Sequence, residues 1–348
     1  MKKIFIYLVI SLIFASCEEF LASDPENEIS SEVFLSSESD LEIYSNGFLE
    51  KYMPHEETLA WGGQHCDNVA TRSSTEFLIG DNWTADDQGN WGDTKNGKWS
   101  QLRNVNYFLD NMVKANDNVS DEIYRHYEGV GRYWRAYFYY DMIKQFGDVP
   151  WYDHEIDYND TEALYKGRDS REYIMDKVLE DLEFAAENCS SESKFVKSST
   201  KITKWVALAF KSRVCLFEGT YRKYHTELGL TASSEKFLRE AIKASEELMA
   251  DSPYALYTSG EVKTQYRSLF TSESLNETEV ILGKACKSDI KMTAITWKLF
   301  SGSFGNNWSL TKDFVNQFLM LDGSRFTDKD GYETIMYNDE FNNRDYRL

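Results

Sequence analysis

The sequence predicts a mainly α-helical protein, a TPR-like (tetratricopeptide-repeat-like) scaffold of stacked helix pairs with long loops and few short strands. Three observations predict this fold. Apolar residues recur every three to four positions through most of residues 30–255, the period of an amphipathic helix. Ser or Thr precedes several of these segments, and Gly or Pro follows them, as at helix ends. Three successive segments begin near residues 170, 203 and 235, close to the TPR spacing of about 34 residues.

The N-terminus has the form of a secretory signal. Lys2 and Lys3 precede an apolar run over residues 4–14, and a small Ala-Ser pair follows. The run is shorter than the roughly 20 apolar residues that a membrane-spanning helix needs. We therefore expect residues 1–16 to be a signal peptide that is removed.

Cys17 comes directly after the Ala-Ser pair. This arrangement resembles a bacterial lipobox, in which cleavage occurs before the Cys and its thiol is acylated, although Phe14 stands where Leu is more usual. A plain secretory signal with an incidental Cys is the alternative. Buried acyl chains contribute about 0.8 kcal/mol per CH₂ and stable anchoring needs more than one chain, as a bacterial lipoprotein carries. We expect Cys17 to be the lipid attachment site and the polar residues 17–29 to be its tether.

The first helix and the first long loop follow the tether. A helical stripe begins near residue 30, where Ser30 or Ser31 can cap it, and Pro54 ends it. Turn-forming Gly, Asp and Asn then replace the apolar period, most densely in GDNWTADDQGNWGDTKNGK, residues 80–98. Long loops inside compact domains are usually functional, so this loop is the first candidate for a binding site.

Five more helical segments are expected before residue 255. They cover residues 99–114, 120–146, a stretch from Ser170 to about 185, 203–217 and 235–249. Gly147 and Gly219 are the predicted stops of the second and fourth of these. The region after residue 255 is less regular, and short strands are expected near residues 280–282.

Composition excludes several functions. The formal net charge is −20, and removal of Lys2 and Lys3 would make it −22. This charge argues against a nucleic-acid partner, which needs a basic surface. The four cysteines after Cys17 form no CxxC and do not fix a disulfide pairing, and the five histidines are scattered, so we predict no metal and no cofactor. The chain has 58 Asp and Glu residues but no phosphate loop or nucleophile elbow, so we predict that it is not an enzyme.

A resemblance to a known family rests on RYWRAYFYYDMIKQFGDVPWY, residues 132–152. It resembles the central segment of SusD/RagB-family nutrient-binding lipoproteins, where a helix of the form R-x-x-R-A-x-x-x-x-x-D runs into F-G-x-V-P. Other segments similar to the family occur in the family's order. They are the lipobox followed by Phe20, Leu21 and Pro25, then GRDSREYIMDKVLEDLEFA (167–185), TKWVALAFKSRVCLFEG (203–219), LMLDGS (319–324) and NRDYRL (343–348).

The resemblance implies a fold, a location and a function. It implies a TPR-like helical region over residues 30–255 and the start of a C-terminal region over 256–348. Family members usually continue past R-D-x-R-L, so we expect that region to be incomplete. It also implies a lipid-anchored protein on the outer face of the outer membrane. Glu18 and Glu19, directly after the lipobox, resemble the signal that sends lipoproteins to this face in some Gram-negative bacteria. Its implied partners are a SusC-like TonB-dependent transporter and an oligosaccharide. A peptide-capturing member of the same family and a TPR-like scaffold that binds only protein are the alternatives.

A glycan site needs flat aromatic faces and nearby polar groups. The 80–98 loop supplies Trp83 and Trp91 with polar residues between and beside them, and a second Gly/Asn-rich segment, SGSFGNN, lies between two further Trp residues. The predicted ligand-binding residues are therefore Asp81, Asn82, Trp83, Asn90, Trp91, Trp297 and Trp308. The alternative for each Trp is that it pins its loop to the core.

Other conspicuous side chains are assigned to structure. Trp134 and Trp205 lie on apolar helix stripes and are expected in the core, as is Cys215. Arg132 and Arg135 are expected to make structural ion pairs, with Asp141 or Glu128 as candidate partners.

Overall fold

The computed structural model describes residues 34–54, 66–71, 91, 98–191, 199–285, 301 and 309–348. Within these residues the protein is mainly helical, as predicted. The longer helices are α3 (Glu38–Tyr52), α6 (Lys98–Asn111), α7 (Asp121–Phe146), α9 (Arg171–Asn188), α11 (Lys204–Tyr224), α12 (Ser234–Asp251) and α13 (Val262–Thr271). The short elements are η2 (Met112–Ala115), α8 (Thr161–Leu164), η3 (Thr226–Leu228), η4 (Thr231–Ser233), α15 (Lys312–Asn316), η5 (Phe326–Asp328), η6 (Tyr332–Thr334) and η7 (Tyr337–Asp339). Two strands, β1 (Val69–Ala70) and β2 (Ser309–Leu310), pair antiparallel.

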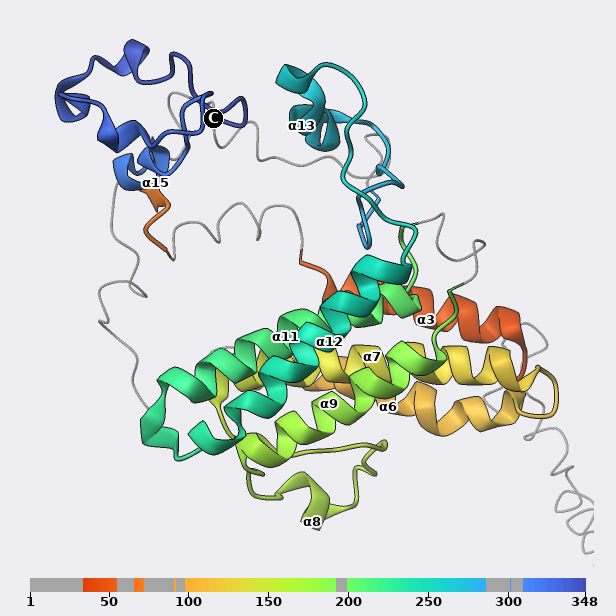
Figure 1. The fold of residues 1–348 in the computed structure, drawn as a ribbon. Helices are drawn as coiled ribbons and strands as arrows, with labels where there is room; N and C mark the ends of the chain where they lie inside the picture. The colour runs from red at the N-terminus through yellow and green to blue at the C-terminus, as the bar shows by residue number, and fades with distance from the viewer. Residues whose placement is uncertain are drawn as a thin grey trace, which may run out of the picture.

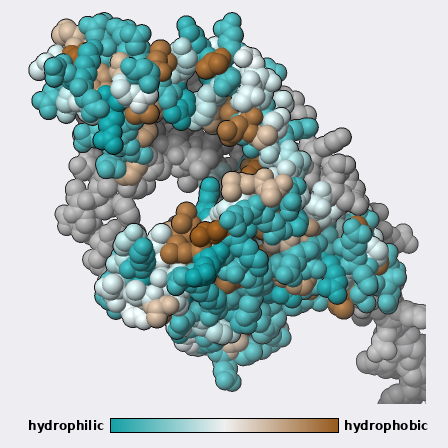
Figure 2. Space-filling view, in the orientation of Figure 1, coloured by the Kyte–Doolittle hydropathy of each residue, from teal (hydrophilic) through white to brown (hydrophobic). Residues whose placement is uncertain are grey.

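Consecutive helices pack against one another in a TPR-like arrangement (Figure 1). α6 packs on α7, α7 on α9, α9 on α11 and α11 on α12, while α3 covers α6 and α7. α13 and the segment from α15 to residue 348 lie on one side of this helical body in Figure 1. Hydrophobic residues are visible on the surface of both in Figure 2, and Phe270 and Tyr337 are more than 70% exposed.

Capping residues set three helix ends where the sequence predicts them. The Ser120 side chain accepts a hydrogen bond from Ile123 N–H at the start of α7, and Ser170 accepts one from Tyr173 N–H at the start of α9. α7 ends at Gly147, whose φ of +68° is a conformation that glycine adopts without a steric penalty. These three ends confirm the prediction from capping residues.

Three predicted element boundaries are wrong. The helix that ends before Pro54 begins at Glu38 and not near residue 30, because Ser37 and Asp40 form a capping box there, and Leu35 has a φ of +67°. α11 continues through Gly219 to Tyr224. A Cβ at position 219 would lie 2.7 Å from Leu238 Cγ, so this glycine permits the close crossing of α11 and α12 and does not end the helix. Residues 280–282 form no strand.

The core is rich in aromatic side chains. Trp134 is 1% exposed and its ring stacks on Tyr52 with 5.2 Å between centroids. Trp205 and Cys215 are also buried, as the sequence predicts. Because each large aromatic ring removes 150–250 Å² from water, this cluster supplies much of the hydrophobic stabilisation of the helical body.

Buried ion pairs join the helices. Arg135 of α7 makes a bidentate ion pair with Asp181 of α9, with N–O distances of 2.7 and 2.8 Å. Burial would lower the pKa of the Arg135 guanidinium, but the Asp181 carboxylate raises it, so Arg135 is cationic. Arg132 pairs with Glu128 at 2.6 Å, one of the partners expected from the sequence. The structural role predicted for both arginines is therefore confirmed, whereas Asp181 as the partner of Arg135 was not anticipated.

Loss of the Arg135 guanidinium should strongly destabilise the helical body. In Arg135→Met the buried Asp181 carboxylate loses its bidentate partner and keeps only the more distant Arg132, whose Nη1 lies 3.7 Å away. Breaking a buried pair in this way typically costs about 3–5 kcal/mol. The matched control is Arg239→Met, because Arg239 pairs with Glu235 at 2.5 Å but its side chain is 74% exposed. Such exposed pairs contribute about 0.3–0.5 kcal/mol. Urea unfolding followed by circular dichroism measures both, and equal losses would contradict the role given to the buried pair.

Candidate binding site

A cavity of about 650 Å³ lies between α6 and the segment that follows α7. This volume falls within the range of roughly 300–1,000 Å³ that is typical of small-molecule sites. The lining residues are Trp91, Trp99, Ser100, Leu102, Arg103, Asn106, Pro150, Tyr152, His154, Ile156, Tyr158, Leu164, Tyr165 and Lys166.

The lining combines aromatic rings with hydrogen-bonding side chains. Five of the lining residues are Trp or Tyr, and Tyr158 and Tyr165 are 79% and 87% exposed. Arg103, Asn106 and Lys166 provide polar groups among these rings. Flat apolar faces beside hydrogen-bonding groups are the combination that a sugar ring requires, because it has an apolar face and a rim of hydroxyls.

Trp91 is the one predicted ligand residue that the structure describes. Its ring packs edge-to-face on Trp99 and Phe146, with centroids 5.3 and 5.1 Å away, and the Arg168 guanidinium lies 4.8 Å from its centroid. Trp91 therefore packs against the helical body and also lines the cavity. Its contact with a ligand stays a prediction.

Side chains from α6 and α7 hold the wall of the cavity through its backbone. The Tyr152 N–H donates to the Tyr139 hydroxyl at 2.6 Å, and that hydroxyl lies 3.2 Å from the Pro150 carbonyl oxygen, to which it donates. Asn106 Nδ2 donates to the carbonyls of Tyr152 and His154, each at 3.0 Å. Burial raises the pKa of Tyr139 well above its usual value, so the hydroxyl keeps the proton that it donates.

Arg135 extends this support to residue 153. Its Nη1 donates to the Asp153 carbonyl at 3.0 Å, so the guanidinium that binds Asp181 also holds the cavity wall. Burial alone would raise the pKa of the Asp153 carboxyl, but a hydrogen bond from His154 and the charge of Arg135 bring it below its usual value. The carboxylate is therefore ionised at neutral pH.

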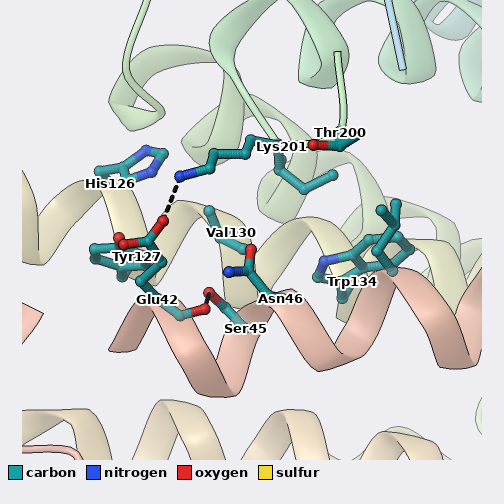
Figure 3. Close-up of a pocket in the computed structure, with 11 residues that line it drawn as sticks. Glu42, Ser45, Asn46, His126, Tyr127, Val130, Trp134, Thr200 and Lys201 are labelled. Carbon is teal, nitrogen blue, oxygen red and sulfur yellow. Dashed lines mark hydrogen bonds and ion pairs between the residues drawn. The ribbon is translucent and has the colours of Figure 1, made fainter. Parts of the chain in front are cut away.

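A second pocket lies between α3, α7 and the chain that enters α11 (Figure 3). Its lining includes Glu42 and Lys201, which form an ion pair, together with His126 and Trp134. Its volume of about 30 Å³ leaves room for one or two water molecules. This pocket is too small for a saccharide.

The remaining predicted site residues lie outside the described residues. These are Cys17, Asp81, Asn82, Trp83, Asn90, Trp297 and Trp308. The strand pair nevertheless relates the two predicted loops, because Val69 of β1 is paired with Leu310 of β2. The chain shortly before the 80–98 loop is thus joined to the chain directly after Trp308. Two segments far apart in the sequence share one anchoring point.

The cavity residues of the segment 150–166 were not predicted from the sequence. This segment has turn-forming residues, several aromatic rings and no apolar period, the same signal that singled out residues 80–98. Tyr158 and Tyr165 could have been found in this way. Arg103 and Asn106 could not, because their positions on α6 have no local signal for a cavity.

No metal-binding cluster or membrane span was found where the structure is described. A search of those residues finds no group of three His, Cys, Asp or Glu side chains placed to hold a metal ion. Among the same residues, no helix combines the length and the apolar character needed to cross a bilayer.

Comparisons with known proteins agree on one family. A model of a SusD-like family, described as "Starch-binding associating with outer membrane", matches residues 19–216. A "SusD-like protein P38" of Formosa agariphila is 25% identical over 281 residues, which are 78% of this chain and 49% of that protein. The chain therefore spans about half the length of this curated relative.

Solved structures share the fold. A SusD-like protein of Bacteroides fragilis superposes with a TM-score of 0.65 at 21% identity, over 93% of this chain and 62% of its own. A SusD-like carbohydrate binding protein of the same species gives a TM-score of 0.67 at 17% identity, over 90% and 58%. A third structure, described with xylogluco-oligosaccharide, gives 0.51 at 18% identity, over 83% and 54%. At these identities the likeness shows the fold alone.

Removal of the Tyr139 hydroxyl should loosen the cavity wall. Tyr139→Phe leaves the partly buried Tyr152 N–H without its acceptor, and an unsatisfied buried group costs up to about 1–3 kcal/mol. We expect the Tyr152 amide to exchange its hydrogen roughly tenfold faster or more, measured by native-state hydrogen exchange.

The matched control is Tyr52→Phe. The Tyr52 hydroxyl is buried and has no hydrogen-bond partner among the described residues. Its removal should leave exchange at Tyr152 unchanged. If the two variants behaved alike, Tyr139 would not be the support of the wall.

Proposed function

Because this chain belongs to the SusD-like family, we propose that it is a cell-surface lipoprotein that captures an oligosaccharide and delivers it to a SusC-like TonB-dependent transporter of the outer membrane. The family description, starch binding and association with the outer membrane, supports both halves of this proposal. The glycan-binding half also has support from the geometry of the described residues.

The aromatic and polar cavity beside α6 is the observation that carries the glycan-binding proposal. Its wall is held by hydrogen bonds from Tyr139 and Asn106, so it is formed before a ligand arrives. Exposed rings such as Tyr158 and Tyr165 are available for stacking on sugar faces. Trp91 connects this cavity to the 80–98 loop, where we propose that Asp81, Asn82, Trp83 and Asn90 extend the binding surface, with Trp297 and Trp308 from the second loop.

Binding without catalysis fits the lining. A glycosidase needs two carboxyl groups on either side of the scissile bond. The described residues that line the cavity include no Asp or Glu. We propose that the cavity holds a saccharide and leaves it intact.

The sequence order supports the surface anchor. In this proposal residues 1–16 are the signal peptide, Cys17 carries the lipid and residues 17–29 are the tether. Residues 30–255 form the helical region, and residues 256–348 begin a C-terminal region. A polar tether between the lipid and the helical region would let the binding face move over a transporter.

The exposed tyrosines of the cavity should be required for glycan retention. We expect the chain lacking residues 1–17 to be retarded in native gels that contain its polysaccharide. The double variant Tyr158→Ala, Tyr165→Ala should reduce this retardation several-fold, because two stacking faces are lost. Trp83→Ala and Trp91→Ala should each weaken it too. Tyr224→Ala is the matched control, because Tyr224 is 72% exposed and lies outside the cavity.

Other outcomes would favour the alternatives. If no polysaccharide retarded the chain but the chain bound tightly to a transporter, the protein-binding scaffold would be favoured. Capture of peptides instead would favour the peptide-binding alternative. Release of shorter sugars from a bound glycan would overturn the proposal that the chain is not an enzyme.

Cys17 should be required for membrane attachment. Wild-type chain produced in a Gram-negative host should incorporate labelled fatty acid and sediment with membranes, whereas Cys17→Ala should do neither, because it lacks the acylated thiol. Cys66→Ala is the control and should keep both properties. Labelled, membrane-bound Cys17→Ala protein would rule out the lipobox interpretation.

A further inference from the structure

The cavity beside α6 differs in charge from the rest of the chain. Its described lining residues include Arg103, His154 and Lys166 and no Asp or Glu. The whole chain has 58 Asp and Glu residues against 38 Lys and Arg. Among the described residues, the lining is therefore basic whereas the whole chain is acidic.

Carboxylates outside the lining hold these basic groups in place. Glu155 binds Arg103 at 2.8 Å, Asp169 binds Lys166 at 2.7 Å and Asp153 lies 2.9 Å from His154 Nδ1. None of these three carboxylates lines the cavity.

Asp169 and Glu155 are themselves fixed by backbone contacts. The Asp169 carboxylate also accepts the Trp151 N–H at 2.7 Å, and the Glu155 N–H donates to Asp110 at 2.6 Å. The carboxylates thus anchor the basic side chains to the cavity wall.

The anchored side chains retain N–H groups for a ligand. Arg103 binds Glu155 through Nε and Nη2, and a guanidinium has five N–H donors in all. Lys166 binds Asp169 and the Trp151 carbonyl, and an ammonium has three donors. Charge-assisted hydrogen bonds to an anion are roughly twice as strong as those between neutral groups. An acidic group in the cavity would therefore find preorganised cationic donors.

We propose that the cavity binds an acidic saccharide, one that carries a carboxylate or a sulfate ester on its sugar rings. This inference rests on the proposed glycan-binding function and specifies its substrate class. The aromatic rings contact the sugar faces, and Arg103, Lys166 and His154 bind the acid groups. Charge then selects against neutral glycans of the same shape.

The overall negative charge of the chain does not prevent this selection. The Debye length is about 8 Å at physiological ionic strength, so remote carboxylates are largely screened. The cationic groups and their partner carboxylates both act at a few ångströms, so the preference rests on the N–H donors of Arg103 and Lys166 that these ion pairs leave for a ligand. Binding of an acidic saccharide should consequently weaken as salt is raised.

Titration calorimetry of the chain lacking residues 1–17 tests the proposal with three probes of equal length. They are a linear oligo-uronate, its carboxyl-reduced neutral counterpart and a sulfated form of that neutral oligosaccharide. We expect at least one acidic probe to bind about tenfold or more tightly than the neutral one at low salt, and the difference to shrink in 0.5 M NaCl, where the Debye length is only a few ångströms. Comparison of the two acidic probes distinguishes carboxylate from sulfate.

Arg103→Gln connects the charge preference to the cavity. Arg103 is 62% exposed at its side chain, so the variant should fold normally. It should weaken acidic binding about two- to fivefold more than it weakens neutral binding, as expected for a partly exposed charge contact. Arg239→Gln, at an exposed arginine that is paired with Glu235 outside the cavity, should change neither.

The possible failures are distinguishable. If the neutral probe bound as tightly as both acidic ones, the acidic class would be overturned while the glycan-binding proposal stood. If none of the three probes bound, both proposals would be overturned. Tighter binding of a glutamate-rich peptide than of either acidic saccharide would overturn the saccharide assignment.

Discussion

The buried ion pair between Arg135 and Asp181 is the interaction on which the candidate site depends. It crosses from α7 to α9, and both partners are almost fully buried. Desolvation of two charges is offset only when the geometry is good and further hydrogen bonds satisfy the remaining donors. The bidentate contact and the bond from Arg135 to the Asp153 carbonyl meet this condition. The Asp153 carbonyl of the cavity wall therefore helps to offset the desolvation of the buried Arg135 charge.

This coupling explains why a segment without regular structure can form a rigid wall. The side chains of Tyr139 and Asn106 are buried in the helical body, and their hydrogen-bond partners are backbone groups of residues 150–154. A shift of this segment would leave several buried polar groups unsatisfied at once, each at a cost of about 1–3 kcal/mol. The helices therefore determine the position of the wall, and a ligand does not have to order it.

Local signals predicted the elements whose ends are set locally. Ser120, Ser170 and Gly147 act within one turn of the helix ends they define, so sequence alone located α7 and the start of α9. Tertiary effects explain the failures. Gly219 permits the close crossing of α11 and α12, and the pairing of β1 with β2 joins residues about 240 positions apart. Asp181 is brought to Arg135 only by the packing of α9 on α7. The cavity was missed for the same reason, since α6 and residues 150–166 meet only in the folded chain.

Affinity and selectivity come from different parts of this cavity. Tyr158 and Tyr165 are exposed and hydrophobic, so stacking on them would reward any sugar of suitable shape. Arg103 and Lys166 are held by Glu155 and Asp169 from outside the lining, so their charge is available without an acidic neighbour inside it. Rings alone would accept neutral and acidic glycans alike, whereas the anchored cations favour only the acidic ones. A net-negative protein can then capture a negative ligand, because salt screens the distant carboxylates and the ion pairs with Glu155 and Asp169 leave N–H donors of Arg103 and Lys166 for the ligand.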